Sequence, residues 1–499
     1  MNRRHFLAAA VAAGLPLAAT LAPRGARAQP NATQAAAPTL ARQLAEYAAG
    51  LRYEDLDSAT IDIVKSHLID ALGCALAALD EPPVRIALDE PPVRIARDAA
   101  RSAGGGPSTI IGTAERTSPD LATFATGTAL RYFDFNDAYA GREIGHPSDN
   151  IAACVAVAEA QHASGRELIL SIALAYEIAC RLMDAAAISP RGWDHTCYSL
   201  PAAALAAGKL MRMPVEALTQ AVNLSLNSHL ALNQTRVQQL SNWKALADAD
   251  AARNAVFSTQ LARAGLTGPS PIFEGEAGFF RQVSGPFELE TSRFGGRGEP
   301  FRIARCFVKY YPAQGFTQTA IPAALDVASQ AGDLSRIRRI DVHTTRVGYV
   351  TAGSEPEKWK PSTRETADHS LPYVVARAML DGDIRTTSFS DAALRDPVLH
   401  ALIAKIRVEE DPALTAGYPA RAANRVTAHC RDGAVYAKQV DDLPGSPTRP
   451  MRREDFEAKF VKNGGARLSE QRMRAALDRL WRLDELQDVA ALPPLFVAG

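Results

Sequence analysis

Hydrophobic residues recur at helical spacing through the first half of the chain. From Leu40 to about Arg263 nearly every segment has this pattern. In the segment Glu167 to Ala187, Glu177 and Arg181 lie one turn apart and are expected to form an ion pair. Such charges inside apolar segments argue against membrane spans. The pattern predicts that residues 38–292 form the first part of an all-helical domain.

A different pattern begins near Arg293. Short β-rich runs are bounded by turn residues and alternate with helical segments, which favours an α/β domain over residues 293–442. Arg431, Asp432 and Gly433 stand between the last two runs and predict a hairpin turn. The predicted strands are Ile340–Thr345, Ile406–Glu409, Arg425–Cys430 and Ala434–Val440, and the predicted helices are Thr317–Gln330 and Asp368–Leu380.

Helical spacing returns from Arg452 to the end of the chain. We expect Phe456, Phe460, Leu477 and Leu480 to be core positions of this last part, residues 443–499. Together the patterns predict an α+β protein in which the helical elements outweigh the strands.

The first 28 residues have a character of their own. Arg3 and Arg4 precede an apolar run that reaches Ala22, and small residues suited to cleavage follow at positions 26–28. This is the pattern of a twin-arginine signal peptide, which predicts export to the periplasm. A membrane anchor is less favoured because Gly14 and Pro16 interrupt an apolar run already shorter than the ~20 residues of a spanning helix. We therefore expect no stable membrane association after cleavage.

Composition narrows the function classes. Cleavage would remove four arginines and no acid from a chain with 55 basic and 55 acidic residues, and the slightly acidic remainder has no general attraction for nucleic acid. The six cysteines contain no CxxC pair and lie mostly in apolar runs, which predicts buried free thiols and gives no ligands for an iron–sulfur cluster. No HxxxH or HExxH spacing supports zinc. We expect neither a metal nor another cofactor.

A dense polar segment, DFNDAYAGREIGHPSDN, occupies residues 134–150 between two apolar helical runs. Polar connections are often only solvated surface, so composition alone leaves that interpretation open. Two features favour an active-site loop instead. Apolar Phe135, Tyr139 and Ile144 stand between the charges, and His146 precedes Pro147, whose ring restricts the histidine backbone to extended conformations.

This segment, with four others, resembles the MmgE/PrpD family, which includes 2-methylcitrate dehydratases, cis-aconitate decarboxylases and iminodisuccinate epimerases. DFND is followed eight residues later by GHPSDN, and the DFND and TADHSLPY runs look most like the methylcitrate dehydratase branch. The other similar segments, in the family's order, are GWDHT (192–196), SNWKALADADAARNAVF (241–257), VKYYPAQGFTQTAI (308–321) and PSTRETADHSLPYVVA (361–376).

The resemblance implies a large helical domain, to which the C-terminal tail returns, with an inserted smaller α/β (ferredoxin-like) lid domain. It also implies a homodimer and a cofactor-independent hydro-lyase that acts on a di- or tricarboxylate by α-proton abstraction. Two alternatives stay open. One is an epimerase or decarboxylase of the same family that acts on a related carboxylate, and the other is a non-catalytic periplasmic protein that binds a carboxylate.

Removal of an α-proton beside a carboxylate needs a general base and cations that neutralise the enediolate. His146 and His195 lie at loop positions beside Asp149 and Asp194, which are candidates to orient their rings, while Lys244 and Lys309 lie in aromatic surroundings. The resemblance implies that the pocket is lined by Asp134, His146, His195, Lys244 and Lys309. On this hypothesis one histidine is the base, Asp134 holds an imidazole, and the lysines bind carboxylates. The sequence leaves open which histidine takes the proton.

Further substrate contacts are expected at Asp137, Ala138, Arg364 and His369, although for the last two a structural network at a domain boundary is an equal alternative. Ala138 stands where the family typically has threonine, and Phe316 stands where histidine is common. A lost hydroxyl and a lost imidazole imply a different substrate contact or reaction.

One repeat has no functional account. The nonapeptide LDEPPVRIA occurs at 79–87 and again at 88–96, and we expect it only to lengthen an exposed loop.

Overall fold

The computed structural model describes residues 37–79 and 91–497 of the 499-residue chain. The expected signal peptide, residues 1–28, lies outside the described residues, and so does most of the repeated nonapeptide.

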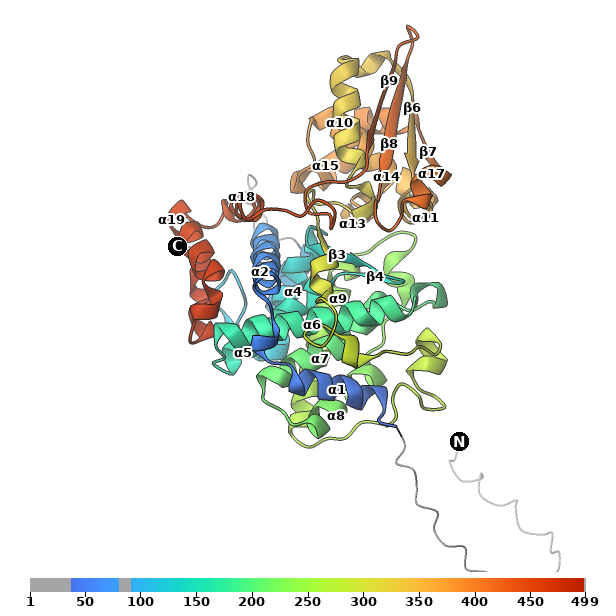
Figure 1. The fold of residues 1–499 in the computed structure, drawn as a ribbon. Coiled ribbons are helices and arrows are strands. Elements are labelled where there is room, and N and C mark those ends of the chain that lie inside the picture. The colour runs from blue at the N-terminus through green and yellow to red at the C-terminus, as the bar shows by residue number, and fades with distance from the viewer. Residues whose placement is uncertain (1–36, 80–90, 498–499) are drawn as a thin grey trace, which may run out of the picture. The chain divides into compact units, whose positions relative to one another are not determined.

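The helices expected in the first half are present, as Figure 1 shows. The helix predicted around Glu177 is α6 (Gly165–Ala185). Its N-cap is Ser164, where a reciprocal capping box with Glu167 satisfies free N–H groups of the first turn. The predicted pair of Glu177 and Arg181 is confirmed at 2.7 Å. The other helices of this half are α1 (Leu40–Gly50), α2 (Ser58–Leu79), α3 (Pro91–Ser102), α4 (Pro119–Tyr132), α5 (Ile151–Ala160), α7 (Ser199–Leu210), α8 (Val215–Ser228) and α9 (Trp243–Arg263).

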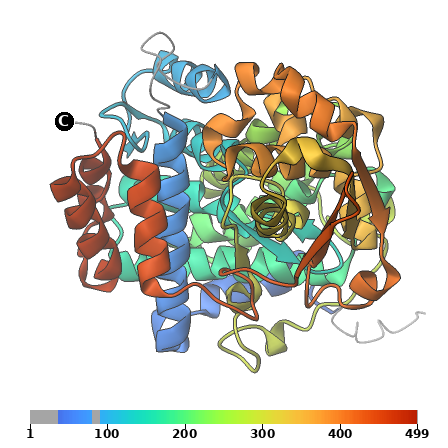
Figure 2. The same ribbon diagram turned by 90° about the horizontal axis from the view of Figure 1, so that it is seen from above.

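The C-terminal helices pack on the first half of the chain. Helix α18 (Arg453–Gly464) runs beside α2 in both Figure 1 and Figure 2, and α19 (Glu470–Trp481) follows it. All four expected core residues of this tail, Phe456, Phe460, Leu477 and Leu480, are buried. Residues from α1 through α9 and from the tail share one hydrophobic cluster.

A second hydrophobic cluster, which runs from Ala313 to Cys430, surrounds a four-stranded sheet in the order β7-β6-β8-β9. The central strand β6 pairs parallel with β7 and antiparallel with β8, so that Ile340 lies opposite both Ile406 and Ala428. Gly433 has a φ of 86° in the predicted hairpin turn. The elements are β6 (Ile337–Thr344), β7 (Ile406–Glu410), β8 (Asn424–Cys430), β9 (Val435–Val440), and the helices α10 (Ala320–Ala331) and α14 (Leu371–Asp381). The fold is therefore mixed α+β and mostly helical.

The expectation of an all-helical first half needs correction. Strand β3 (Asp137–Ala140) pairs with β4 (Ile144–Gly145) and with β5 (Phe307–Val308), which makes a three-stranded sheet from two strands of the polar segment and one strand before Lys309. Strands of two to four residues are too short to leave an alternating pattern in the sequence. This small sheet places the polar segment beside the residues that precede Lys309.

Two other sequence expectations can be compared with the described residues. All six cysteines are buried free thiols, as predicted. In the described part of the chain, no helix combines the length and the apolar character that a membrane crossing requires.

Candidate active site

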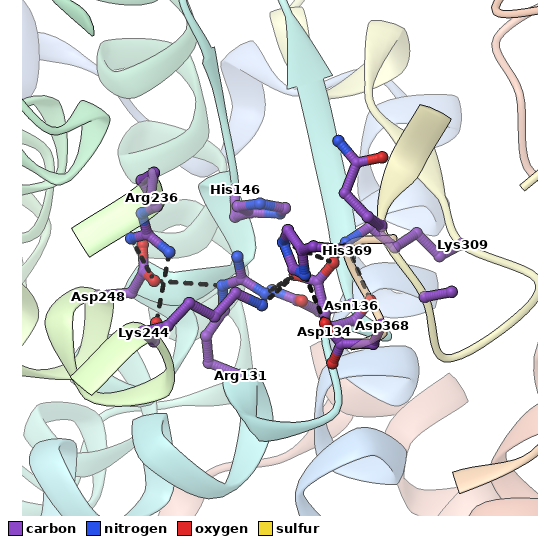
Figure 3. Close-up of polar contacts among 12 residues, drawn as sticks. Arg131, Asp134, Asn136, His146, Arg236, Lys244, Asp248, Lys309, Asp368 and His369 are labelled. Carbon is purple, nitrogen blue, oxygen red and sulfur yellow. Dashed lines mark hydrogen bonds and ion pairs between the residues drawn. The ribbon is translucent and has the colours of Figure 1, made fainter. Parts of the chain in front are cut away.

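A cavity of about 830 Å³ opens where the small sheet meets the segment around the four-stranded sheet. Six of the nine residues expected from the sequence to form the site line it, namely Asp134, Ala138, His146, His195, Lys309 and His369. Figure 3 shows how Asp134, His146, Lys309 and His369 converge, with Lys244 beside Arg131.

Asp134 is the centre of this arrangement. Its carboxylate is 1% exposed and pairs with Arg131, with Lys244 Nζ at 2.9 Å and with Lys309 Nζ at 2.6 Å. Burial by itself would raise the pKa of the Asp134 carboxyl, but the three cations outweigh it and hold the pKa well below its usual range. Asp134 therefore does not hold His146 or His195, as the sequence hypothesis supposed, but organises the cations.

Two arginines connect Asp134 to a second group of acids. Arg131 Nε lies 3.2 Å from Asp248 Oδ2, and Arg236 bonds to both Asp194 and Asp248 at 2.9 Å. The network thus joins four cations, Arg131, Arg236, Lys244 and Lys309, to the three carboxylates of Asp134, Asp194 and Asp248.

Asp149 adjoins this network. Its Oδ1 lies 3.7 Å from Arg131 Nε, and burial together with the nearby Asp248 raises the pKa of its carboxyl. Around Asp134, the three cations Arg131, Lys244 and Lys309 share one carboxylate, which favours the binding of an anion beside them.

His146 is held in one tautomer. Its Nδ1 lies 2.6 Å from the backbone carbonyl of Asp137, which can only accept, so Nδ1 carries the proton and Nε2 is left as an acceptor. Burial, followed by the cations Arg131 and Lys309, lowers the pKa of His146 well below 6.5. The ring is therefore neutral at pH 7. The expectation that Asp149 orients this ring was wrong, because the backbone of Asp137 does so.

His195 has a different environment. Its Nδ1 lies 3.3 Å from Asp194 Oδ1 and its Nε2 lies 3.2 Å from Asp248 Oδ1, which confirms Asp194 as one orienting group. An imidazole can donate toward both carboxylates only when both nitrogens carry protons. The ring centroids of His146 and His195 are 5.5 Å apart, and both residues line the cavity.

Asp137 does not reach the cavity, contrary to the expected substrate contact. Its carboxylate accepts hydrogen bonds from His67 Nδ1 at 2.7 Å and from the Tyr176 hydroxyl at 2.6 Å, and another from the backbone N–H of Ser148. These bonds fix the position of Asp137. Its backbone carbonyl in turn orients the ring of His146. His67 lies far away in the sequence, and no local signal pointed to it.

Lys309 is fixed from behind by Lys459. The Lys459 ammonium group donates to the backbone carbonyls of Phe135 and Lys309, each at 2.8 Å, and pairs with Asp70 at 2.6 Å. Lys459 of α18 thus connects the polar segment, residues 134–150, to the loop that begins at Lys309. The side-chain oxygen of Gln318 accepts hydrogen bonds from the backbone N–H groups of Tyr310 and Tyr311. These two bonds fix the backbone of the same loop.

The remaining expected residues surround Asp134 at different depths. Lys244 is buried behind the cavity wall, where burial and Arg131 lower its pKa to about 8. His369 Nε2 lies 3.9 Å from Asp134 Oδ2, and burial and Lys244 lower the pKa of this histidine to about 4. Arg364 does not line the cavity. Its guanidinium lies 4.4 Å from the ring centroid of Phe133. This position agrees with the alternative that Arg364 is part of a structural network and does not contact the substrate.

Sequence reasoning missed Arg131, Arg236 and Asp248. Arg131 stands three residues before Asp134, and Asp248 stands four residues after Lys244, on the same helix face. That helical spacing was a usable signal for Asp248, whereas Arg236 lies on the connection that precedes α9.

The comparisons with known proteins agree with this geometry. A model of the MmgE/PrpD N-terminal domain matches residues 42–292, and a model of the MmgE/PrpD C-terminal domain matches residues 311–483. The chain belongs to the MmgE/PrpD family.

Relatives of this MmgE/PrpD chain carry enzyme names. It is 26% identical over 469 residues to a 2-methylcitrate dehydratase from Cupriavidus necator, with 86% of this chain and 91% of the relative covered. It is 27% identical over 464 residues to one from Salmonella typhimurium, with coverage of 87% and 93%. The human cis-aconitate decarboxylase is 24% identical over 413 residues, with coverage of 78% and 82%. The chain is thus a member of a dehydratase or lyase family.

The MmgE/PrpD site also contains one group with the spacing of metal ligands. Ligand atoms of Asp149, His195 and Asp248 all lie within 4.8 Å of one another. Arg131 and Arg236 already pair with Asp248, and Arg131 Nε also lies 3.7 Å from Asp149 Oδ1. A divalent cation would stand beside these two guanidinium groups, whose charge repels it, so these residues do not suit a metal.

Proposed function

We propose that this MmgE/PrpD protein is a cofactor-independent hydro-lyase that acts on a di- or tricarboxylate of the 2-methylcitrate type. The observation that carries the proposal is the neutral His146, which lines the cavity near Arg131 and Lys309 and keeps Nε2 as an acceptor. The names of the relatives in the comparisons support the same class of reaction.

In the proposed reaction, His146 Nε2 takes the α-proton, and the C–H electron pair enters the carbon framework as an enediolate. Lys309 and Arg131 neutralise the negative charge that develops on the carboxylate. His195 then protonates the departing hydroxyl, so that the C–O bond breaks, water leaves and an alkene remains. Each step uses only protons and charges that these side chains supply.

The test is proton NMR of the mature protein in heavy water with citrate-like, aconitate-like and aspartate-derived acids. An alkene product supports the proposal and identifies the substrate. Deuterium exchange at the α-carbon without an alkene would instead indicate an epimerase, and loss of carbon dioxide would indicate a decarboxylase. Binding without any conversion would favour a non-catalytic carboxylate-binding protein.

We further propose that the α/β segment, residues 293–442, acts as a lid, because it contributes Lys309 and His369 to a site otherwise built on the helical part. Substrate closure would then slow amide hydrogen exchange at both edges of the cavity. We also propose a homodimer, which light scattering coupled to size-exclusion chromatography tests directly. A monomer that retains full turnover would contradict it.

We propose periplasmic localisation through the twin-arginine pathway, on the basis of Arg3 and Arg4 before the apolar run. Replacing both with lysine is expected to keep the precursor in the cytoplasmic fraction. Equal amounts of processed protein in the periplasm of both strains would overturn this proposal.

A further inference from the structure

We propose that the substrate carries an apolar substituent longer than a methyl group, which lies against Phe316 and Tyr418. The inference rests on the proposed lyase function and specifies its substrate class. It follows from the different character of the two ends of the cavity.

The deep end of the cavity is polar and closely packed. Asp134 and Lys309 are each 1% exposed, and His195 is 8% exposed. At this end Lys309 and Arg131 would bind a substrate carboxylate, and His146 would take the α-proton. Both cations already pair with Asp134. This end accounts for the charged part of a substrate, and the cavity of about 830 Å³ extends beyond it.

The wall beyond this end is aromatic and aliphatic. The rings of Phe316 and Tyr418 lie 5.8 Å apart at 50°, and Phe307 and Val350 line the same space. Val350 and Tyr310 are 49% and 47% exposed there, although large apolar side chains are usually covered. A small tricarboxylate bound to the deep end would leave these surfaces in water, whereas an apolar substituent would cover them.

Phe316 is a fixed part of this wall. Its backbone N–H donates to Gln314 Oε1 at 2.8 Å, and its carbonyl accepts from Asn424 Nδ2 at 2.8 Å. A Cβ added at Gly348 would lie 3.5 Å from the Phe316 Cβ, so the chains approach closely behind it. The aromatic wall is thus present before a ligand binds, which reduces the entropic cost of binding.

Among the other charged residues of the cavity wall, Glu143 is 5% exposed and accepts from the backbone N–H groups of Ile188 and Ser189, whereas three belong to the solvated rim. Side chains of Arg305 and Arg421 are 51% and 60% exposed, and that of Asp441 is 44% exposed. An apolar substituent can reach Phe316 without removing these charges from water. The small side chain of Ala138, 2% exposed, adds apolar surface where a hydroxyl would bind a polar group.

The test uses a series of citrates with methyl, ethyl, butyl and hexyl substituents on the mature protein. We expect kcat/KM to rise about fourfold for each methylene that is buried. Phe316→Ala is expected to flatten this dependence. Phe257→Ala removes an aromatic ring that is 43% exposed and does not line the cavity, and it is the matched control that should keep the wild-type dependence.

Dissociation constants for the same series, measured by calorimetry, separate this inference from the proposed function. Turnover that is fastest with the methyl compound and falls with chain length overturns the apolar substituent but leaves the lyase intact. No turnover, with affinity that still rises with chain length, overturns the lyase and supports the apolar subsite. Neither turnover nor a trend in affinity overturns both, and this wild-type series does not depend on whether any variant folds.

Discussion

Lys309 bonds to Asp134 twice, through the carboxylate at 2.6 Å and through the backbone carbonyl at 2.9 Å. Asp134 has a φ of 50°, a left-handed conformation that a residue other than glycine keeps only where its surroundings enforce it. The lysine thus holds both the strained backbone and the side chain of the residue that pairs with Arg131 and Lys244. The four residues form one preorganised group of charges.

Replacing Asp134 with asparagine removes the shared counter-charge of this group. Because the buried Lys244 and Lys309 then lose their carboxylate partner, while Arg131 keeps Asp248, we expect the free energy of unfolding to fall by about 3–5 kcal/mol, with loss of turnover. Denaturant unfolding measures the first effect. Asp391→Asn breaks an ion pair whose side chains are 74% and 85% exposed and should change neither quantity. Equal unfolding curves for both variants would contradict the central role of Asp134.

The pH dependence of kcat/KM follows from two lowered pKa values. Lys244 does not line the cavity, but its positive charge adds to the field that attracts a carboxylate. Its pKa is lowered to about 8, so kcat/KM should fall as pH rises through 8. His146 must be neutral to accept a proton, and its pKa lies well below 6.5, so the acidic decline should lie below pH 6.5. Lys244→Met should abolish the alkaline decline while lowering the overall rate. An unchanged alkaline decline in that variant would assign it to another group.

Lys459→Met tests how the site is supported from behind. The substitution leaves Asp70, which is 3% exposed, without its cation, and leaves two backbone carbonyls without their donor. We expect a loss of about 3–5 kcal/mol in the free energy of unfolding. Lys462→Met changes an exposed lysine of the same helix and is the control. Adding Asp70→Leu to Lys459→Met should recover part of the loss, and failure to do so would show that the pair is not the cause.

The sequence was sufficient for those parts of the fold that leave a long periodic pattern. Helices such as α6 and the strands β6 to β9 were predicted within a few residues of where they lie. The strands β3 to β5 were not predicted, because they are only two to four residues long and because β3 pairs with β5, about 170 residues away, which leaves no local signal. Yet this pairing brings Ala138 beside Phe307 and thereby Lys309 toward Asp134.

The sequence predicted which kinds of residue form the candidate site, but not which of them bond to one another. His146, His195 and Lys309 do converge, but the sequence could not tell that Asp137 turns away from the cavity toward His67 and Tyr176. Which groups become partners depends on burial and on long-range packing, and a buried charge takes whichever opposite charge the fold places beside it. For that reason Asp134 pairs with three cations and not with His146 or His195.

The most direct test of the account compares His146→Gln with His195→Gln in heavy water, with α-deuterium incorporation and alkene formation measured separately by NMR. If His146 is the base, His146→Gln should lose both signals by a factor of about 10²–10⁴. His195→Gln should retain deuterium exchange and lose alkene formation, because only the departure of the hydroxyl lacks its proton. Retained exchange in His146→Gln, with exchange lost in His195→Gln, would contradict the assignment of the base.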